Sequence, residues 1–283
     1  MDDVPLPYQV TQARDETADT VTLTLAPTGT GLLAPFTPGR YALVHALGVG
    51  TVPVPVSRID RHEIALTIRS SDAVSAALCA LRPGGRVGLR GPFGTGWELD
   101  RAVGHDLLVV ATGLGPAPLR PLVLDVLAAP QLYGHLNVLV GARTPDDILY
   151  AQQTHAWSAA HGPPHCAVTV DRPGPGWEGP VGAVTALLDG ARFDPRNTTA
   201  YVCGPAGTVR ETARALLARG LPAERVRVAL DRPDSPDGHD GHPDRETGRS
   251  DGTGPGDVLS RDGGPVVGWD EVESATTAGR TDT

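Results

Sequence analysis

The residues best suited to do chemistry lie between Asp106 and Leu122. A run of β-forming side chains from Leu107 to Val110 stops at Thr112-Gly113-Leu114-Gly115, and a proline-rich helical pattern follows. Glycines let backbone N–H groups approach a pyrophosphate closely, and a helix N-terminus favours an anion. Pro118 stands where the usual dinucleotide fingerprint has its third glycine. The stretch therefore predicts either a nucleotide-binding strand–turn–helix unit or an ordinary buried strand with a glycine turn.

Composition excludes several other chemistries. All 24 basic residues are arginine, which rules out a Schiff-base lysine and a phosphate-loop lysine. Residues 231–283 carry 13 Asp and Glu against 5 Arg, so most of the net charge of −9 lies there and nucleic-acid binding is disfavoured. Three widely spaced cysteines indicate a reducing compartment. With no leader pattern and no long apolar run, we expect a soluble, cytoplasmic protein without membrane insertion.

Residues 8–100 contain short alternating segments separated by turn clusters, which predicts a small antiparallel barrel or sandwich. One helix is expected near 75–81, with Ser71, Asp72 or Ser75 as its cap. The alternating segments are 21–25, 41–46, 52–57, 64–68 and 87–89.

From His105 the pattern changes to alternating strands and helices, which is typical of a parallel, doubly wound sheet with ligands at its carboxyl edge. The expected strands are 107–111, 136–141, 166–170, 199–203 and 226–230, and the expected helices are 118–128, 146–160, 181–188 and 206–219. We thus expect domains at 1–102 and 103–230. Residues 231–283 offer few core side chains, and disorder is predicted for most of them.

Several stretches resemble, in order, motifs of the ferredoxin–NADP reductase superfamily. They are Phe36-Thr37-Pro38-Gly39-Arg40-Tyr41, Val54-Pro55-Val56-Ser57, Leu89-Arg90-Gly91-Pro92-Phe93-Gly94, the turn Ala111–Leu119, and Cys203-Gly204-Pro205. Gly141–Tyr150 and Thr169-Val170-Asp171-Arg172 are most similar to one branch. That branch holds the gamma subunits of NiFe hydrogenases, sulfite reductase B subunits and the electron-transfer subunit of dihydroorotate dehydrogenase.

The resemblance implies an FAD-binding barrel, an NAD(P)-binding α/β domain and hydride transfer between nicotinamide and flavin, with electrons passed to a redox partner subunit such as a hydrogenase. The implied flavin-binding positions are Val54, Pro55, Val56, Ser57, Thr67, Ile68, Arg69, Val74 and Ser75. The implied nucleotide-binding positions are Gly113, Leu114, Gly115, Arg143, Asp171, Gly204 and Pro205, and Cys203 would lie beside the reacting nicotinamide.

Departures from the family pattern keep alternatives open. Val54 and Val56 replace an arginine and a tyrosine, which removes a phosphate contact and an aromatic face. Asp72 replaces a glycine, and its carboxylate would oppose a diphosphate unless it points away. Arg143 either binds an adenosine 2′-phosphate or is a solvated loop residue, so NAD and NADP both remain open. Cys203 is alternatively a buried packing residue, and Asp171 is alternatively a turn residue that binds no ligand.

The C-terminal arm departs furthest. Relatives in the branch carry a [2Fe–2S] cluster there, and its four cysteine positions are now Ser235, Asp240, Pro243 and Ser260. Such clusters need thiolates, and no cysteine follows Cys203, so we predict no cluster and no metal site. Three functions are compatible with the sequence: a diaphorase-like subunit of a larger enzyme, a stand-alone flavin or quinone reductase, and a non-catalytic subunit kept for assembly.

Overall fold

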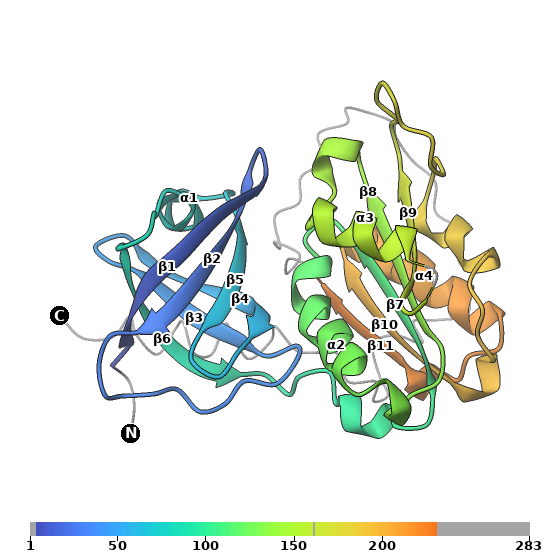
Figure 1. Cartoon of the computed structure of the whole chain (residues 1–283), viewed down its shortest axis with the longest axis horizontal. Helices are drawn as coiled ribbons and strands as arrows, with labels where there is room; N and C mark the ends of the chain where they lie inside the picture. The colour runs from blue at the N-terminus through green and yellow to red at the C-terminus, as the bar shows by residue number, and fades with distance from the viewer. Residues whose placement is uncertain (1–3, 161, 231–283) are drawn as a thin grey trace, which may run out of the picture.

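The computed structural model of the chain describes residues 4–160 and 162–230, which form two lobes (Figure 1). Three predictions concern residues 231–283: disorder, the lack of a [2Fe–2S] cluster and the lack of a metal site. These residues lie outside the part of the chain that the structure describes. In the first lobe six strands close into an antiparallel barrel in the order β1-β2-β5-β4-β3-β6. They are β1 (Leu6–Thr17), β2 (Thr20–Pro27), β3 (Tyr41–Ala46), β4 (Gly50–Ile59), β5 (Ile64–Arg69) and β6 (Arg86–Phe93).

Alternation along the strands decides what fills the barrel. Val54, Val56 and Ile68 belong to its buried apolar core, whereas Ser57 and Thr67 hydrogen-bond to each other outside that core. Helix α1 (Ala73–Cys79) closes the barrel and contributes Leu78 to the same core. The barrel therefore keeps polar side chains of β4 and β5 for contacts outside it.

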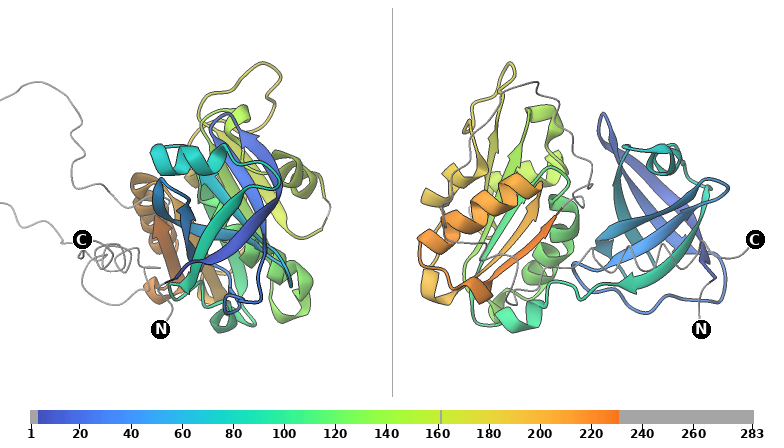
Figure 2. Two further views of the ribbon diagram at one scale, coloured as in Figure 1. Left: turned by 90° about the vertical axis from the view of Figure 1, so that its left-hand side faces the viewer. Right: turned by 180° about the vertical axis from the view of Figure 1, so that it is seen from behind.

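The second lobe is a five-stranded parallel sheet in the order β11-β10-β7-β8-β9. Helices cover both faces: α2 and α3 on one, α4 and the 3₁₀ helix η4 on the other (Figures 1 and 2). The strands are β7 (Asp106–Thr112), β8 (Leu136–Ala142), β9 (His165–Val170), β10 (Thr198–Gly204) and β11 (Val226–Leu230), and the helices are α2 (Pro116–Ala128), α3 (Ala151–Ala159) and α4 (Ala206–Ala218). The 3₁₀ helices are η1 (Leu99–Ala102), η2 (Pro130–Leu132), η3 (Pro145–Asp147), η4 (Val184–Asp189), η5 (Pro195–Asn197) and η6 (Ala223–Arg225).

Two predicted helices differ from the structure. The segment 146–160 is broken: η3 is followed by extended Ile148, Tyr150 has a left-handed φ of 53°, and α3 starts only at Ala151. The segment 181–188 forms the 3₁₀ helix η4 instead of an α-helix. In both places tertiary contacts override a weak helical pattern, because Ile148, Leu149 and Val184 are buried.

The lobes pack directly on each other. Helix α2 lies against β4, and the Trp97 indole N–H, 1% exposed, donates to the Pro118 carbonyl at 2.9 Å. Arg120 of α2 donates from Nη1 to the Ser57 carbonyl at 3.1 Å. Within the described residues no helix is both long and apolar enough to span a bilayer.

Candidate functional site

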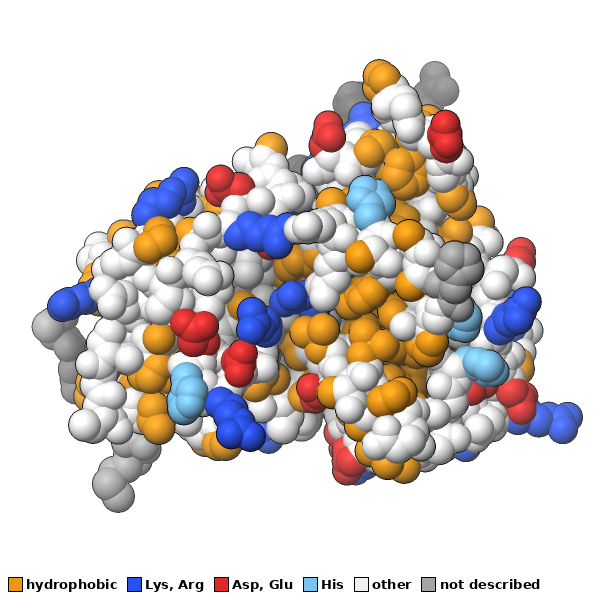
Figure 3. Space-filling view, in the orientation of Figure 1, with side chains coloured by type: hydrophobic (Ala, Val, Ile, Leu, Met, Phe, Trp, Pro, Cys, Tyr) orange, Lys and Arg blue, Asp and Glu red, His pale blue; other side chains and the backbone are white. Residues whose placement is uncertain are grey.

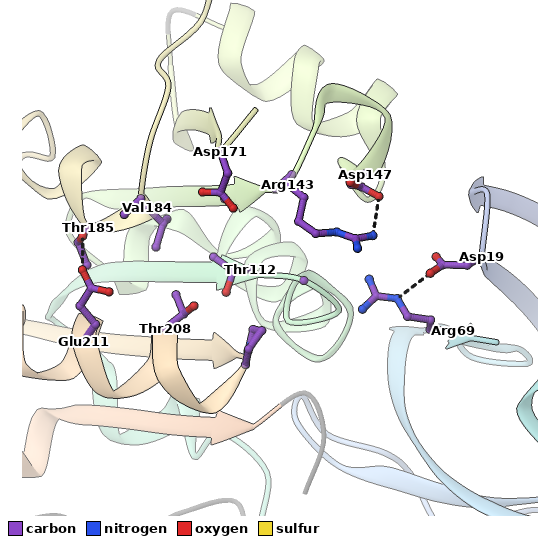
Figure 4. A pocket seen from close by; sticks show the side chains of 15 residues that line it. Asp19, Arg69, Thr112, Arg143, Asp147, Asp171, Val184, Thr185, Thr208 and Glu211 are labelled. Atoms are coloured by element: carbon purple, nitrogen blue, oxygen red, sulfur yellow. Dashed lines mark hydrogen bonds and ion pairs between the residues drawn. The ribbon is translucent and has the colours of Figure 1, made fainter. Parts of the chain in front are cut away.

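A cavity of about 500 Å³ opens at the carboxyl edge of the parallel sheet (Figure 4). Its walls include Gly113 after β7, Arg143 after β8, Asp171 after β9 and Pro205 after β10. Arg69 of β5 enters from the barrel side, so the cavity spans both lobes. Five of the residues predicted from the sequence thus meet in one place, where parallel-sheet proteins bind nucleotides.

The charges of this cavity are largely paired among themselves. Arg143 Nη2 lies 3.0 Å from Asp147 Oδ1, and Arg69 Nε lies 3.6 Å from Asp19 Oδ2. Glu211 accepts a hydrogen bond from the Thr185 hydroxyl at 3.2 Å. The lining holds four carboxylates against two guanidinium groups, so the cavity is acidic overall.

The glycines at the ends of β7 and β10 are required for different structural reasons. Gly113 has φ +59°, a left-handed conformation that glycine adopts without strain, and it lines the cavity. A Cβ on Gly115 would collide with the Cys203 carbonyl, and its N–H already donates to Thr112 at 2.9 Å. A Cβ on Gly204 would collide with the Thr112 hydroxyl. Gly115 and Gly204 therefore bring the ends of β7 and β10 into close contact, while Gly113 faces the ligand space.

The predicted flavin-binding residues of the barrel lie in two different environments. Val54 and Val56 pack inside the barrel, and so do Ile68 and, in part, Val74. Ser57 and Thr67 are fully buried at the lobe interface, where the Thr67 hydroxyl donates to Ser57 Oγ at 2.9 Å. Of the predicted flavin-binding positions, only Arg69 lines the cavity at the carboxyl edge of the sheet.

The N-terminus of α1 is capped by the chain itself. One oxygen of Asp72 accepts from the N–H groups of Val74 and Ser75 at 2.9 and 2.8 Å, and the Ser75 hydroxyl accepts from the Asp72 N–H at 2.9 Å. The hydrogen bond from the Ser75 N–H lowers the pKa of Asp72, so the carboxylate is ionised at neutral pH. Asp72 does not point away from the helix, and a diphosphate would have to compete with it for the same donors.

A hydrogen-bonded cluster at the interface was not anticipated from the sequence. The Tyr150 hydroxyl lies 2.6 Å from Thr67 Oγ1, and Thr22 Oγ1 lies 2.8 Å from the same atom. The Thr67 hydroxyl has one hydrogen and donates it to Ser57. The hydroxyls of Tyr150 and Thr22 must therefore both donate to Thr67 Oγ1. Burial raises the pKa of Tyr150, which keeps this donor protonated.

Other lining residues were also missed. Thr208 and Glu211 reach the cavity from the first turns of α4, and Val184 reaches it from η4. The only sequence signal for Thr208 and Glu211 is their position soon after the end of β10, and Val184 has no such signal because a long connection separates it from β9. Tyr150 ends the quoted motif Gly141–Tyr150, but nothing in the motif shows what its hydroxyl contacts.

Leu114, Cys203 and Gly204 complete the turn region. Cys203 is 1% exposed within the core that packs against α2, and Gly204 is buried beside it. Leu114 is half-buried directly before Gly115. The structure thus brings the two predicted turns, after β7 and after β10, side by side on neighbouring strands.

A closed antiparallel barrel joined to a parallel sheet, with a cavity spanning the two, defines the two-domain fold of ferredoxin reductase-like oxidoreductases. The model of the oxidoreductase NAD-binding domain matches residues 109–214. Sulfhydrogenase 1 subunit gamma of Pyrococcus furiosus is 31% identical over 201 residues, covering 70% of this chain and 68% of the relative. A probable electron-transfer subunit of dihydroorotate dehydrogenase B from Methanocella arvoryzae is 33% identical over 168 residues, covering 59% and 57%.

A solved ferredoxin NADP+ reductase from Neisseria gonorrhoeae, with bound FAD and NADP, has the same fold. Its TM-score is 0.64 at 17% identity, over 79% of this chain and 97% of that one. The chain therefore belongs to the ferredoxin reductase-like family, in the branch of hydrogenase gamma subunits and dihydroorotate dehydrogenase electron-transfer subunits. It is a member of an oxidoreductase family with an NAD-binding domain, as its motifs predicted.

Proposed function

We propose that the chain binds a nicotinamide nucleotide in the cavity lined by Gly113, Arg143 and Asp171, opposite a flavin on the barrel, and passes electrons to a partner subunit. The observation that carries the proposal is that one cavity joins the ends of four parallel strands to Arg69 of the barrel. A flavin bound there supplies the hydride acceptor. The chain's own contribution is to hold the two ligands face to face and exclude water.

The nucleotide side fits its ligand well. The first turn of α4 has no side-chain cap, and Pro205 and Thr208 from its start line the cavity. Uncapped backbone N–H groups at a helix start favour a phosphate. Asp171 has the acceptor oxygens that a ribose hydroxyl needs, and buried Cys203 supports the turn from behind.

The flavin side fits in part. Arg40 Nε is buried with no hydrogen-bond partner in the described part of the chain, and such an atom calls for an acceptor. Arg40 also fixes β4 because its carbonyl accepts from the Val56 N–H at 3.1 Å. Ser57 and Thr67 would support the flavin strand from the opposite face. The capped start of α1 is the unfavourable part of the site for FAD.

The partner subunit is proposed from the relatives. The names of the two relatives describe them as subunits of larger enzymes. We propose that this chain is likewise a gamma-type, diaphorase-like subunit. We further propose that it works without a [2Fe–2S] cluster, because its last cysteine is Cys203 and the cluster needs thiolates. The partner must then approach the flavin directly.

Two observations favour a second candidate, a non-catalytic subunit. The Asp72 cap takes the α1 donors that a diphosphate would use, and Val54 and Val56 turn into the barrel instead of toward a ligand. A chain retained only for assembly would tolerate both features. The two candidates differ in whether the protein holds FAD.

An anaerobic titration tests both. The purified full chain, reconstituted with FAD, is titrated with NADH and with NADPH while the flavin absorbance is followed. Bleaching by either nucleotide is the expected result and excludes the non-catalytic candidate. Protein that stays colourless after reconstitution would overturn the oxidoreductase proposal for this chain and favour the assembly role.

A further inference from the structure

A second cavity, of about 420 Å³, lies between the outer face of the barrel and helices α2 and α3. It shares no lining residue with the nicotinamide cavity. Three arginines from three elements line it: Arg14 on β1, Arg58 on β4 and Arg120 on α2. Figure 3 shows basic side chains gathered at this junction of the two lobes. The proposed oxidoreductase function leaves this cavity without a role.

Arg120 is the deepest of the three. It is half-buried, and burial lowers the pKa of its guanidinium. Nε donates to Gln153 Oε1 at 2.7 Å, Nη1 donates to the Ser57 carbonyl at 3.1 Å, and the group lies 4.8 Å from the centroid of the Tyr150 ring. Among the described residues no carboxylate lies within ion-pair distance of it. These bonds use two of its five N–H donors, which leaves the others for a ligand.

In the described chain no other charged side chain of the cavity forms an ion pair with Arg120. Glu16, the one carboxylate among the lining residues in the described chain, has a 3% exposed side chain and lies 3.7 Å from Arg14 Nε. Arg58 is bound by Asp60 at 2.8 Å, outside the lining, with 47% of its side chain exposed. A partly desolvated guanidinium costs free energy until an anion offsets it. The amide groups of Gln12, Gln152 and Gln153 add neutral donors beside it.

We propose that this cavity binds a carboxylate-bearing ligand, anchored by Arg120 at its inner end and by Arg14 and Arg58 at its exposed rim. The planar fork of arginine matches a carboxylate in two parallel hydrogen bonds. The volume lies in the range of small-molecule sites and accommodates a di- or tricarboxylate. An acidic side chain presented by another protein offers the same group.

Ligand binding at this cavity joins the two lobes. Arg14 and Arg58 belong to the barrel, whereas Arg120 belongs to the sheet domain and already contacts the backbone of Ser57. The proposal rests on the cavity alone and holds whether or not the chain binds a flavin.

Isothermal titration of the full chain tests the proposal, with sodium citrate as one probe and a hexaglutamate peptide as the other, at constant ionic strength. The variant is Arg14→Gln with Arg58→Gln, both of which have exposed side chains. The matched control is Arg210→Gln with Arg214→Gln, which removes the same charge from the exposed face of α4. We expect the cavity variant to bind about tenfold more weakly than wild type and the control to bind equally.

Each outcome decides something. Binding of citrate alone identifies a free small carboxylate as the source, binding of the peptide alone identifies an acidic side chain, and binding of both shows that the carboxylate group itself is recognised. The proposal is overturned if neither probe binds, or if the cavity variant binds as tightly as the control.

Discussion

Each arginine of the cavity proposed to bind the nicotinamide already has a carboxylate of the chain beside it. Arg143 is bound by Asp147 at 3.0 Å, and Arg69 lies 3.6 Å from Asp19. Asp171 and Glu211 add two further carboxylates without an arginine partner in the described lining. A 2′-phosphate carries about two negative charges and would have to displace Asp147 from Arg143. We therefore expect the chain to prefer NADH to NADPH.

Asp147→Asn tests this preference. The substitution releases the Arg143 guanidinium, which then meets the 2′-phosphate, so kcat/KM for NADPH should rise about tenfold while that for NADH changes little. The measurement is the anaerobic rate of flavin reduction by each nucleotide. Asp146→Asn is the control, because it removes the same charge from an exposed neighbour outside the cavity. An equal gain in both variants would assign the effect to net charge instead of Arg143.

At the scale of elements, we expect the capped start of α1 to weaken FAD binding. Asp72→Gly frees the N–H groups of Val74 and Ser75 and removes a carboxylate, so the dissociation constant for FAD should fall about tenfold. Riboflavin has no phosphate, and its affinity should not change. Both are measured by quenching of flavin fluorescence.

Asp72→Asn separates the two effects of that substitution. Asparagine caps a helix about as well as aspartate, so this variant removes the charge and keeps the cap. It should bind FAD with an affinity between those of wild type and Asp72→Gly. If all three proteins bind FAD equally, the diphosphate does not lie at α1.

The turn after β7 gives an element-scale prediction about stability. Gly115→Ala places a Cβ against the Cys203 carbonyl, and this backbone contact should cost about 1–3 kcal/mol of unfolding free energy. Gly207→Ala is the matched control: a Cβ there meets nothing within 4 Å, and the residue lies in the first turn of α4, where alanine fits a helical backbone. Urea unfolding measures both. A Gly115→Ala protein as stable as wild type would show that the turn can move away.

The elements that sequence predicts well are those with strong periodicity. The five parallel strands were located to within about a residue, because buried runs such as 107–111 have few alternatives. The helix predicted at 146–160 is interrupted because Ile148, Leu149 and Tyr150 are buried and Tyr150 takes a left-handed conformation, with its hydroxyl hydrogen-bonded to Thr67. Motif order predicted that the turns after β7 and β10 lie side by side, whereas the places of Glu211 and Thr208 in the cavity depend on how α4 packs, which a single sequence does not encode locally.

At the scale of the whole molecule, the two lobes are held by polar contacts as well as by packing. Thr67 of the barrel accepts from Tyr150 of the sheet domain, and Arg120 connects the Tyr150 ring with the Ser57 carbonyl. All of these side chains adjoin the strand proposed to carry the flavin. The same cluster therefore fixes both the relative position of the lobes and the back of the flavin strand.

Tyr150→Phe tests the contribution of this cluster. The ring stays beneath Arg120, but the hydrogen bond to Thr67 is lost, so the free energy of unfolding should fall by about 1 kcal/mol. Thr67→Val breaks the same bond from the other lobe, and in a double-mutant cycle the two losses should not add. Tyr133→Phe is the control, since its hydroxyl has no hydrogen bond within the described chain, and it should change stability by less than about 0.5 kcal/mol. Urea unfolding of the full chain gives all four values. Additive losses of Tyr150→Phe and Thr67→Val would show that the two hydroxyls stabilise their own lobes separately and do not couple them.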